Sequence, residues 1–361
     1  VRNNVVFNWG AAGIVFEDGN ESFNDVSGNT IVGLTYSDAT ENTFGQGNAG
    51  HTGAGIWCRG GNNVIEGNWV SGAARGYIVS PYMAEAKANA RIPRSPESDT
   101  QVTGQFDLVN LRRLPLRRFA DNTAFGGWMT NGIEIWWVGV DGATPYPDMA
   151  ESVVEGLTVC HSFDKAYYNY TTNRVTFRNC RFVNDPAQNK GIGFFSSDYW
   201  AFDFKMADCL VHGYDVGYLA APIGNQRVEG GDFYNATNFS AGVLWVAGSP
   251  PEFIPPRTVT LSGVTQAWSR EAVALDGTPH QPQDSTNLRA ANVFNVVAHQ
   301  GYLDDSFRLY WREQAAGAIM PQSVTRPTGE WVSILACPEA GLTNAQAQAK
   351  YGIAWGGAIA P

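Results

Sequence analysis

The sequence predicts an all-β fold: a right-handed parallel β-helix, a solenoid with three short strands per coil and about nine to ten coils, ending in a C-terminal cap. The main observation is a phrase that recurs along the chain and is clearest at residues 62–79, NNVIEGNWVSGAARGYIV. Its units are 23 to 35 residues long where no large loop intervenes. A single coil of this kind cannot bury its apolar face, so the core forms only when coils stack. Right-handedness is expected because parallel crossover connections are usually right-handed.

Composition supports the same fold class. The chain has 361 residues, of which 44% are hydrophobic and only 16% charged, with 40 Gly, 14 Tyr and 12 Trp. Few long helix formers and many turn residues favour β-structure with tight turns. The net charge of −10 argues against a general nucleic-acid binder, which needs a basic face. No apolar run approaches the roughly 18 residues of a membrane-spanning helix.

Two repeated positions define the phrase. The first carries Asn in the early units and is later replaced by Leu, Cys, Asp and Val; it comprises Asn4, Asn29, Asn68, Asn122, Leu157, Cys180, Cys209, Asp232 and Val264. The second is Gly or Ala and comprises Gly13, Gly55, Gly76, Gly132, Ala166, Gly193, Gly217, Gly242 and Ala272. Seven of the nine offsets between them are 8 to 10 residues. We expect an inward ladder of Asn amides and, one residue after each Gly, an inward apolar row.

Two insertions interrupt the repeat, at residues 34–52 and 81–121, and the second is expected to contain a short helix at Met83–Ala90. We assign residues 1–280 to the β-helix. Residues 281–361 are expected to form the last coil and a capping region, with a short helix at Thr343–Lys350. The chain begins at Val1 inside a repeat and without Met, so we expect a mature or truncated segment with further coils upstream.

The candidate binding residues come from outward rows two and four residues after the Gly position. Side chains alternate faces along a strand, so these rows are predicted to form a ribbon of exposed rings. Flat rings flanked by carboxylates and Arg suit a carbohydrate, and the candidate stacking residues are Trp57, Trp136, Tyr168 and Tyr170. The alternative is that the insertions fold over this face and bury it as a second core.

The candidate catalytic residues are Glu17, Asp18, Glu134, Arg59 and His51. Glycoside hydrolysis needs two carboxyl groups about 5–5.5 Å or 6.5–9.5 Å apart. A lyase needs a base together with Arg or a metal ion that neutralises a uronate. The oxygen-rich turn from Glu17 to Asp25 is also a candidate Ca²⁺ site, although a purely structural turn explains it equally well.

A basic cluster stands out in this acidic chain. Arg112, Arg113, Arg117 and Arg118 lie close together in the second insertion. Two interpretations stay open: the cluster binds an anionic polysaccharide, with Arg112 and Arg113 as contacts, or it pairs with the acidic turn.

The first 80 residues resemble a known family. The runs Asn3–Gly10, Gly13–Glu21 with Asn24, and Gly55–Asn63 are similar to a segment of the β-helix of the cell-migration-inducing and transmembrane hyaluronidases. The resemblance implies an extracellular protein that handles polysaccharides, and it carries no catalytic residue onto this chain.

Together these observations favour a secreted or cell-surface protein that binds, and as a hydrolase or lyase degrades, an extracellular polysaccharide. The rival interpretation is a non-catalytic adhesin or filament subunit, in which exposed rings bind protein and an open strand edge promotes self-association.

Overall fold

The computed structural model describes residues 1–34, 53–81, 89–141, 144–185, 191–196, 201–221, 224–235, 237–241, 257–268, 292–299 and 332–335. The chain divides into two compact units, Val1–Val183 and Asn184–Pro361, which are described separately. Both units are all-β in their described parts, which contain no α-helix. The predicted fold class is therefore confirmed at the level of an all-β, solenoid-like arrangement of parallel strands.

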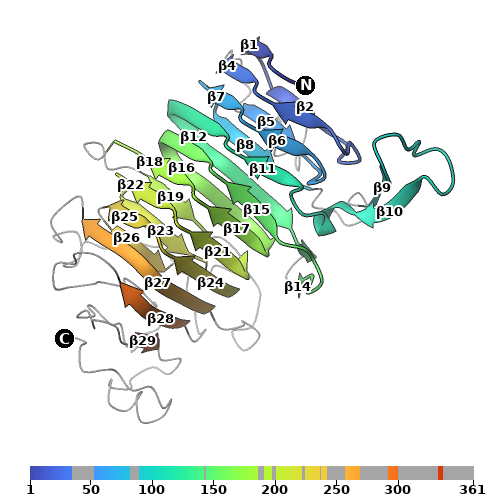
Figure 1. The fold of residues 1–361 in the computed structure, drawn as a ribbon. Coiled ribbons are helices and arrows are strands. Elements are labelled where there is room, and N and C mark those ends of the chain that lie inside the picture. The colour runs from blue at the N-terminus through green and yellow to red at the C-terminus, as the bar shows by residue number, and fades with distance from the viewer. Residues whose placement is uncertain are drawn as a thin grey trace, which may run out of the picture. The chain divides into compact units, whose positions relative to one another are not determined.

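The first unit consists of three columns of strands, and the strands within each column pair in parallel (Figure 1). The first column contains β3 (Asp25–Ser27), β6 (Val64–Glu66), β11 (Arg118–Ala120), β15 (Ser152–Glu155) and β17 (Val175–Arg178). The second contains β1 (Val5–Trp9), β4 (Thr30–Leu34), β7 (Trp69–Ser71), the first parts of β12 (Thr123–Val138) and β16 (Thr158–Asn173), and β18 (Arg181–Val183). The third contains β2 (Ala12–Phe16), β5 (Ala54–Cys58), β8 (Arg75–Val79) and the second parts of β12 and β16.

Each column contributes one continuous apolar row to the core. The first column supplies Val26, Ile65, Phe119, Val154 and Phe177, the second Ile31, Val70, Ala124, Val159 and Phe182, and the third Ile56, Tyr77, Ile133 and Tyr167. All of these side chains are at most 3% exposed. The third row is the one predicted directly after the repeated Gly, so that prediction is confirmed in this unit.

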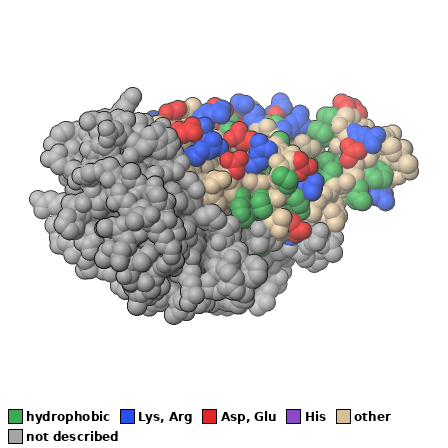
Figure 2. Space-filling view, turned by 90° about the horizontal axis from the view of Figure 1, so that it is seen from below, with side chains coloured by type: hydrophobic (Ala, Val, Ile, Leu, Met, Phe, Trp, Pro, Cys, Tyr) green, Lys and Arg blue, Asp and Glu red, His purple; other side chains and the backbone are tan. Residues whose placement is uncertain are grey.

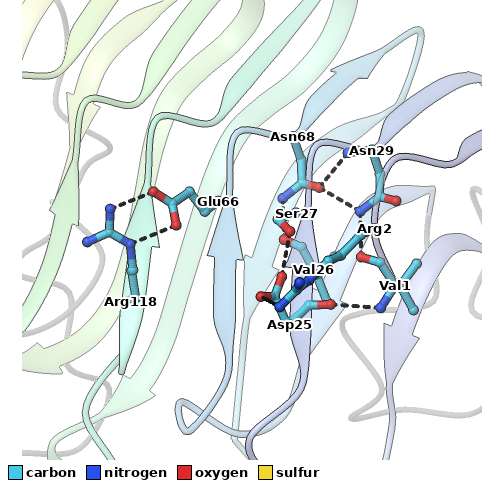
Figure 3. Close-up of polar contacts among 9 residues, drawn as sticks. All are labelled: Val1, Arg2, Asp25, Val26, Ser27, Asn29, Glu66, Asn68 and Arg118. Carbon is cyan, nitrogen blue, oxygen red and sulfur yellow. Dashed lines mark hydrogen bonds and ion pairs between the residues drawn. The ribbon is translucent and has the colours of Figure 1, made fainter.

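The Asn ladder is also confirmed. The Oδ1 atom of Asn29 accepts from the backbone N–H and the side-chain amide of Asn4, at 3.0 and 3.1 Å. Asn68 accepts in the same way from Asn29 (Figure 3). Asn122 accepts in the same way from Asn68. The ladder ends at Leu157, which is fully buried in the same row. Each coil thus satisfies the buried polar groups of the coil before it.

A left-handed residue precedes every ladder position in this unit. The φ angles of Asn3, Gly28, Gly67, Asp121, Gly156 and Asn179 are 55°, 63°, 62°, 52°, 61° and 53°. Gly, Asn and Asp are the residues that adopt this conformation at least cost. Their recurrence turns the chain at the same place in each coil and keeps the coils in register.

The repeated Gly row has a different cause, because its φ angles are not left-handed. A Cβ atom on Gly13 would lie 2.7 Å from the carbonyl oxygen of Gly55, and one on Gly132 would lie 2.7 Å from that of Ala166. The backbone of the next coil passes too close to these two positions for a side chain. Gly is required at Gly13 and Gly132 by contact, whereas Ala166 in the same row carries a Cβ atom.

The first column carries ion pairs on its outer face. Arg118 donates from Nε to Glu66 at 2.8 Å and also pairs through Nη2, and Arg2 pairs with Asp25 (Figure 3). The hydrogen bond from Arg118 holds the pKa of Glu66 below its usual value of 4.5. Hydrogen bonds from Ser27 and Arg2 likewise lower the pKa of Asp25.

These shifts predict a weak acid sensitivity. A carboxyl group with a lowered folded-state pKa adds stability above its unfolded pKa and loses it as pH falls through the folded value. We expect Arg118→Gln to lower stability only slightly at pH 7, since the pair is exposed, and to cost less below pH 4.5. Urea unfolding at pH 7 and pH 3.5 measures the difference, and an equal cost at both values would contradict it.

The second insertion forms a hairpin and a short turn. Strands β9 (Asn89–Pro93) and β10 (Phe106–Asn110) are antiparallel, and the 3-10 turn η2 (Leu111–Arg113) follows. Asn89 and Ala90 are strand residues, so the helix predicted at Met83–Ala90 is wrong at its end, because the hairpin pairs them. Residues 82–88 and 35–52 lie outside the described part. A smaller antiparallel hairpin, β13 (Val140–Asp141) with β14 (Thr144–Pro145), follows β12.

The second unit repeats the three-column plan. One column contains β21 (Phe204–Ala207), β24 (Gly224–Glu229), the first part of β27 (Arg257–Trp268) and β28 (Asn292–His299). Another contains β22 (Leu210–His212), β25 (Asp232–Asn235) and the end of β27, and the third contains β19 (Ile192–Phe195), β23 (Val216–Ala220) and β26 (Thr237–Ala241). Strand β20 (Ala201–Phe202) precedes β21, and β29 (Val332–Leu335) pairs with β28 antiparallel.

One register prediction fails in this unit. Tyr218 pairs with Phe239, whereas the Gly242 alignment placed Val243 beside it. The chain reaches the third column after a shorter turn than in other coils, so the repeated Gly is absent there. The change to a capping region near residue 280 and the helix at Thr343–Lys350 fall mainly outside the described residues and stay predictions.

Candidate functional site

The predicted outward row of the third column exists in the first unit. Val15 pairs with Trp57, Trp57 with Ile78, Ile78 with Glu134 and Glu134 with Tyr168. The sequence alignment therefore gave the correct register across five coils.

The predicted exposure of this row is wrong for much of its length. Trp57 and Ile78 are 0% exposed and Glu134 is 1% exposed. Trp57 packs with Ala54 and Ile78, and the Arg59 guanidinium lies 4.6 Å from the centre of its ring. Arg59 is itself 2% exposed. These two residues are packed into a second core and do not offer a surface to a polymer.

The second insertion supplies part of this cover. The backbone N–H of Arg117 donates to the carbonyl of Gly61 at 2.8 Å, and that of Gly139 donates to the carbonyl of Arg112 at 2.7 Å. Leu111 is fully buried, and its side chain lies against Gly19. The return path of the insertion thus lies across the ends of the third-column strands, as the second-core interpretation expected.

A cluster of aromatic rings remains half-exposed beyond this cover. Trp136 stacks on Tyr170 with ring centres 4.9 Å apart, and its edge meets Tyr168 at 5.7 Å. Trp137 lies 5.3 Å from Tyr170. All four side chains are half-buried. Three of the four predicted stacking residues therefore lie together, and we call Trp136, Trp137, Tyr168 and Tyr170 the ring cluster.

A β-bulge shapes the ring cluster. Trp136 pairs with Thr171, not with Tyr170 as the alignment implied, and Trp137 has a left-handed φ of 61°. This conformation is unusual for a bulky residue. The bulge brings the two adjacent indoles of β12 to the same tyrosine, which regular alternation would prevent.

Glu134 lies at the base of the same face. Its Oε1 atom accepts from Arg75 Nε and from Asn131 Nδ2, both at 2.6 Å. Its Oε2 atom and the Oδ1 atom of Asn131 are buried and have no hydrogen-bond partner within the described part of the chain. Arg75 is 29% exposed, and Lys165, which is 16% exposed, lies 5.2 Å from the Tyr168 ring. Lys165 also pairs with Asp164. Two ion pairs and the ring cluster therefore share one face of β8, β12 and β16.

The acidic turn lies elsewhere. Glu17 and Asp18 are exposed after β2, three strands away from Glu134, or roughly 14 Å of backbone. Asp18 lines an open hollow of about 440 Å³ with Asn20, Asn89, Ala90, Arg91, Thr100 and Gln101. The predicted carboxylates thus fall in two places and do not form one pair.

The basic cluster is dispersed. Arg112 is 2% exposed, pairs with Asp141 at 3.0 Å and lies 5.4 Å from the Trp137 ring centre. Arg113 lies on Tyr146, Arg117 on Phe23, and Arg118 pairs with Glu66. Figure 2 shows basic and acidic side chains interspersed over the described surface that this view presents. Of the two open interpretations, neither is confirmed: Arg112 serves packing, and only Arg117 meets the acidic turn, through an aromatic ring.

The remaining candidates add no ligand set. His51 lies outside the described residues. Among the residues that the structure describes, no three His, Cys, Asp or Glu side chains are close enough to hold a metal ion. Cys58, Cys180 and Cys209 are free and buried, and burial raises the pKa of the Cys58 thiol far above its usual range. The described residues also contain no helix with the length and hydrophobicity needed to cross a membrane.

Comparisons with protein-family models, with curated proteins and with solved structures gave no match.

Arg75, Asn131 and Lys165 were not predicted as site residues. They occupy one register row, with Arg75 paired to Asn131 and Asn131 to Lys165. This row precedes the repeated Gly by one residue, and the alignment tracked only the rows that follow it. A search of both sides of the Gly position for charged residues would have found it.

Proposed function

We propose that the protein is a right-handed parallel β-helix that binds an extracellular polysaccharide on the outer face of β8, β12 and β16. The proposal rests on one observation: a half-exposed ring cluster lies beside Arg75, Lys165 and Glu134 on a rigid parallel sheet. The resemblance to the hyaluronidase β-helix is part of the same proposal.

The ring cluster supports sugar binding through preorganisation. Stacked and edge-to-face contacts hold Trp136, Tyr168 and Tyr170 against each other in fixed orientations. A ligand that contacts them therefore does not have to order flexible side chains, which lowers the entropic cost of binding. Aromatic rings offer apolar faces to sugar C–H groups, and the two indole N–H groups are buried without an acceptor in the described residues.

The neighbouring charges favour an anionic polymer. Arg75 pairs with Glu134 and Lys165 pairs with Asp164, and both cations keep part of their side chains in solvent, where a polymer carboxylate can reach them. In a chain of net charge −10, a local pair of cations attracts a uronate polymer only at short range, so binding should weaken as salt screens the charges.

Glu134 is the candidate acid or base if the polymer is cleaved. Its Oε1 accepts hydrogen bonds from Arg75 and Asn131, while Oε2 is buried without a hydrogen-bond partner in the described residues and is the oxygen that would accept or give up a proton in the reaction. A lyase reaction uses this base and a cation that neutralises the uronate. Arg75 is the candidate for that cation, because Arg59 is buried. Secretion and catalysis are both parts of the proposal.

The test is affinity electrophoresis in gels that contain hyaluronan, polygalacturonate or alginate. We expect wild-type protein to be retarded by at least one polymer. Replacing Trp136 and Tyr168 with Ala should weaken that retardation about tenfold, because each lost ring contact is worth roughly 0.5–1.5 kcal/mol. Leu108→Ala is the control, since Leu108 is 71% exposed on the β10 hairpin and away from the ring cluster.

Thermal unfolding of each variant shows whether it is folded. Unchanged retardation of folded Trp136→Ala and Tyr168→Ala proteins would overturn the binding site. Cleavage is detected as absorbance of unsaturated uronates or as new reducing ends. If wild-type protein cleaves a polymer, Glu134→Gln should abolish cleavage but keep binding. A Glu134→Gln protein that still cleaves the polymer would show that Glu134 is not catalytic.

A further inference from the structure

The second column of the first unit has an outer face of its own. Two registered rows of outward side chains cross its six strands. The first row is Val5, Thr30, Trp69, Thr123, Thr158 and Arg181, and the second is Phe7, Val32, Ser71, Phe125, Cys160 and Val183. Their strand neighbours Ile31, Val70, Ala124, Val159 and Phe182 point into the core.

Large apolar side chains are exposed on this face. Val5 is 75% exposed, Phe7 67%, Trp69 54% and Phe125 42%. Fully buried neighbours already complete the core beneath them, so folding does not require rings at these positions. Grouped exposed apolar side chains usually mark a binding surface.

The same face is nearly free of charge. Among the twelve side chains of the two rows, only Arg181, in the last strand, is charged. The outer face of the first column differs, since it carries Asp25, Glu66, Arg118, Glu155 and Arg178. A charged partner would gain no pairing on the second column and would lose hydration.

Hydroxyl groups separate the rings. Thr30, Thr123, Thr158 and Ser71 alternate with Trp69 and Phe125 in the two rows. Hydroxyls both donate and accept hydrogen bonds, as the hydroxyls of a sugar do. Parallel strands lie about 4.8 Å apart, so Phe7 and Phe125 are roughly 14 Å apart with Trp69 between them. That length accommodates several units of an extended chain.

We infer that this second-column face binds a neutral polysaccharide. Ring faces would stack on sugar rings, and the Thr and Ser hydroxyls would meet the sugar hydroxyls. The inference does not depend on the proposed function, because the residues lie on a different column and the ligand differs in charge. A second copy of the chain is the competing occupant.

The experiment measures retardation in native gels that contain hydroxyethylcellulose, xyloglucan or galactomannan, all neutral. Wild-type protein should be retarded by at least one of them, with little dependence on salt. Trp69→Ala and Phe125→Ala should each weaken the interaction about tenfold, whereas Trp136→Ala should not change it. The reverse pattern is expected with the anionic polymers, so the two proposals fail separately.

Cys160 gives a second measurement. It is half-buried in the same row as Phe125, and burial raises the pKa of its thiol. Bound polymer should slow its alkylation by iodoacetamide at pH 8.5, with the Cys160→Ser variant identifying the labelled site. Lack of retardation on all three neutral polymers would overturn the inference. A folded Trp69→Ala protein that binds these polymers as tightly as wild type would also overturn it. A concentration-dependent dimer of the wild type that Trp69→Ala dissociates would show that a second copy occupies the face instead.

Discussion

Replacing Asn68 with Leu is expected to lower the free energy of unfolding by about 3–5 kcal/mol. Asn68 is 1% exposed, and its Oδ1 accepts from the backbone N–H and the side chain of Asn29 at 3.1 and 2.9 Å. Its Nδ2 donates to the carbonyl of Val26 at 2.8 Å and to Asn122 Oδ1 at 3.0 Å. The substitution removes all four bonds and leaves the buried backbone N–H of Asn29 without its acceptor, whereas Asn122 Oδ1 still accepts from the backbone N–H of residue 68.

Steric misfit does not explain the expected loss, because the row accepts Leu elsewhere. Leu157 occupies the position that follows Asn122 in the same ladder and is fully buried. The matched control is Asn4→Leu. Asn4 is exposed, so water replaces its bonds to Arg2 and Asn29, and we expect a loss below about 1 kcal/mol. Urea midpoints for the two variants provide the measurement, and equal losses would contradict a hydrogen-bonded ladder as the source of stability.

Features repeated in every coil could be predicted from the sequence. Asn29, Asn68 and Asn122 recur at one position, and the apolar residue after Gly55, Gly76 and Gly132 recurs at another. Both patterns arise because each coil repeats the contacts of the one before it, so a local pattern reports a tertiary contact. The same argument gave the correct register for Trp57, Ile78 and Glu134.

Features that depend on the insertions could not be predicted. Trp57 faces outward from its column as expected, but packing around it leaves no exposed surface. The sequence suggested that Arg112 belongs to a basic patch, yet its side chain is buried, pairs with Asp141 and lies against the Trp137 ring. Nothing in the repeat specifies where a long insertion returns. The bulge at Trp137 is a further break in the pattern, and it shifts the pairing of Trp136 by one residue.

The exposure of Trp69 was within reach of the sequence. The run Trp69-Val70-Ser71 alternates, and Val70 must face the core because it stacks in register on Ile31. Trp69 then has to face solvent unless another segment covers it. Rows counted from the repeated Gly lie in the third column only, so they do not include the outward residues of the second column.

Replacing Gly76 with Ala is the second large effect, and we expect it to cost about 2–3 kcal/mol. A Cβ atom at this position would lie 2.7 Å from the Cβ of Ala124 and would overlap the carbonyl oxygen of Gly132 in the next coil. The backbone conformation itself permits Ala, so the cost comes from the clash between coils. The carbonyl cannot move away without disturbing the pairing of β8 with β12.

Gly10→Ala is the control, because a Cβ atom there would meet nothing within 4 Å. It should be neutral or slightly stabilising, since Ala lowers the entropy of the unfolded chain. The double variant with Ala124→Gly separates the two contacts of Gly76. Removing the Ala124 methyl group should restore only part of the stability if the Gly132 carbonyl causes most of the strain. Two results would contradict a clash with the Gly132 carbonyl: full restoration of stability in the double variant, or a Gly76→Ala protein that unfolds at the wild-type urea concentration. Either result would show that the coils can separate at this point, so Gly76 would be present for another reason.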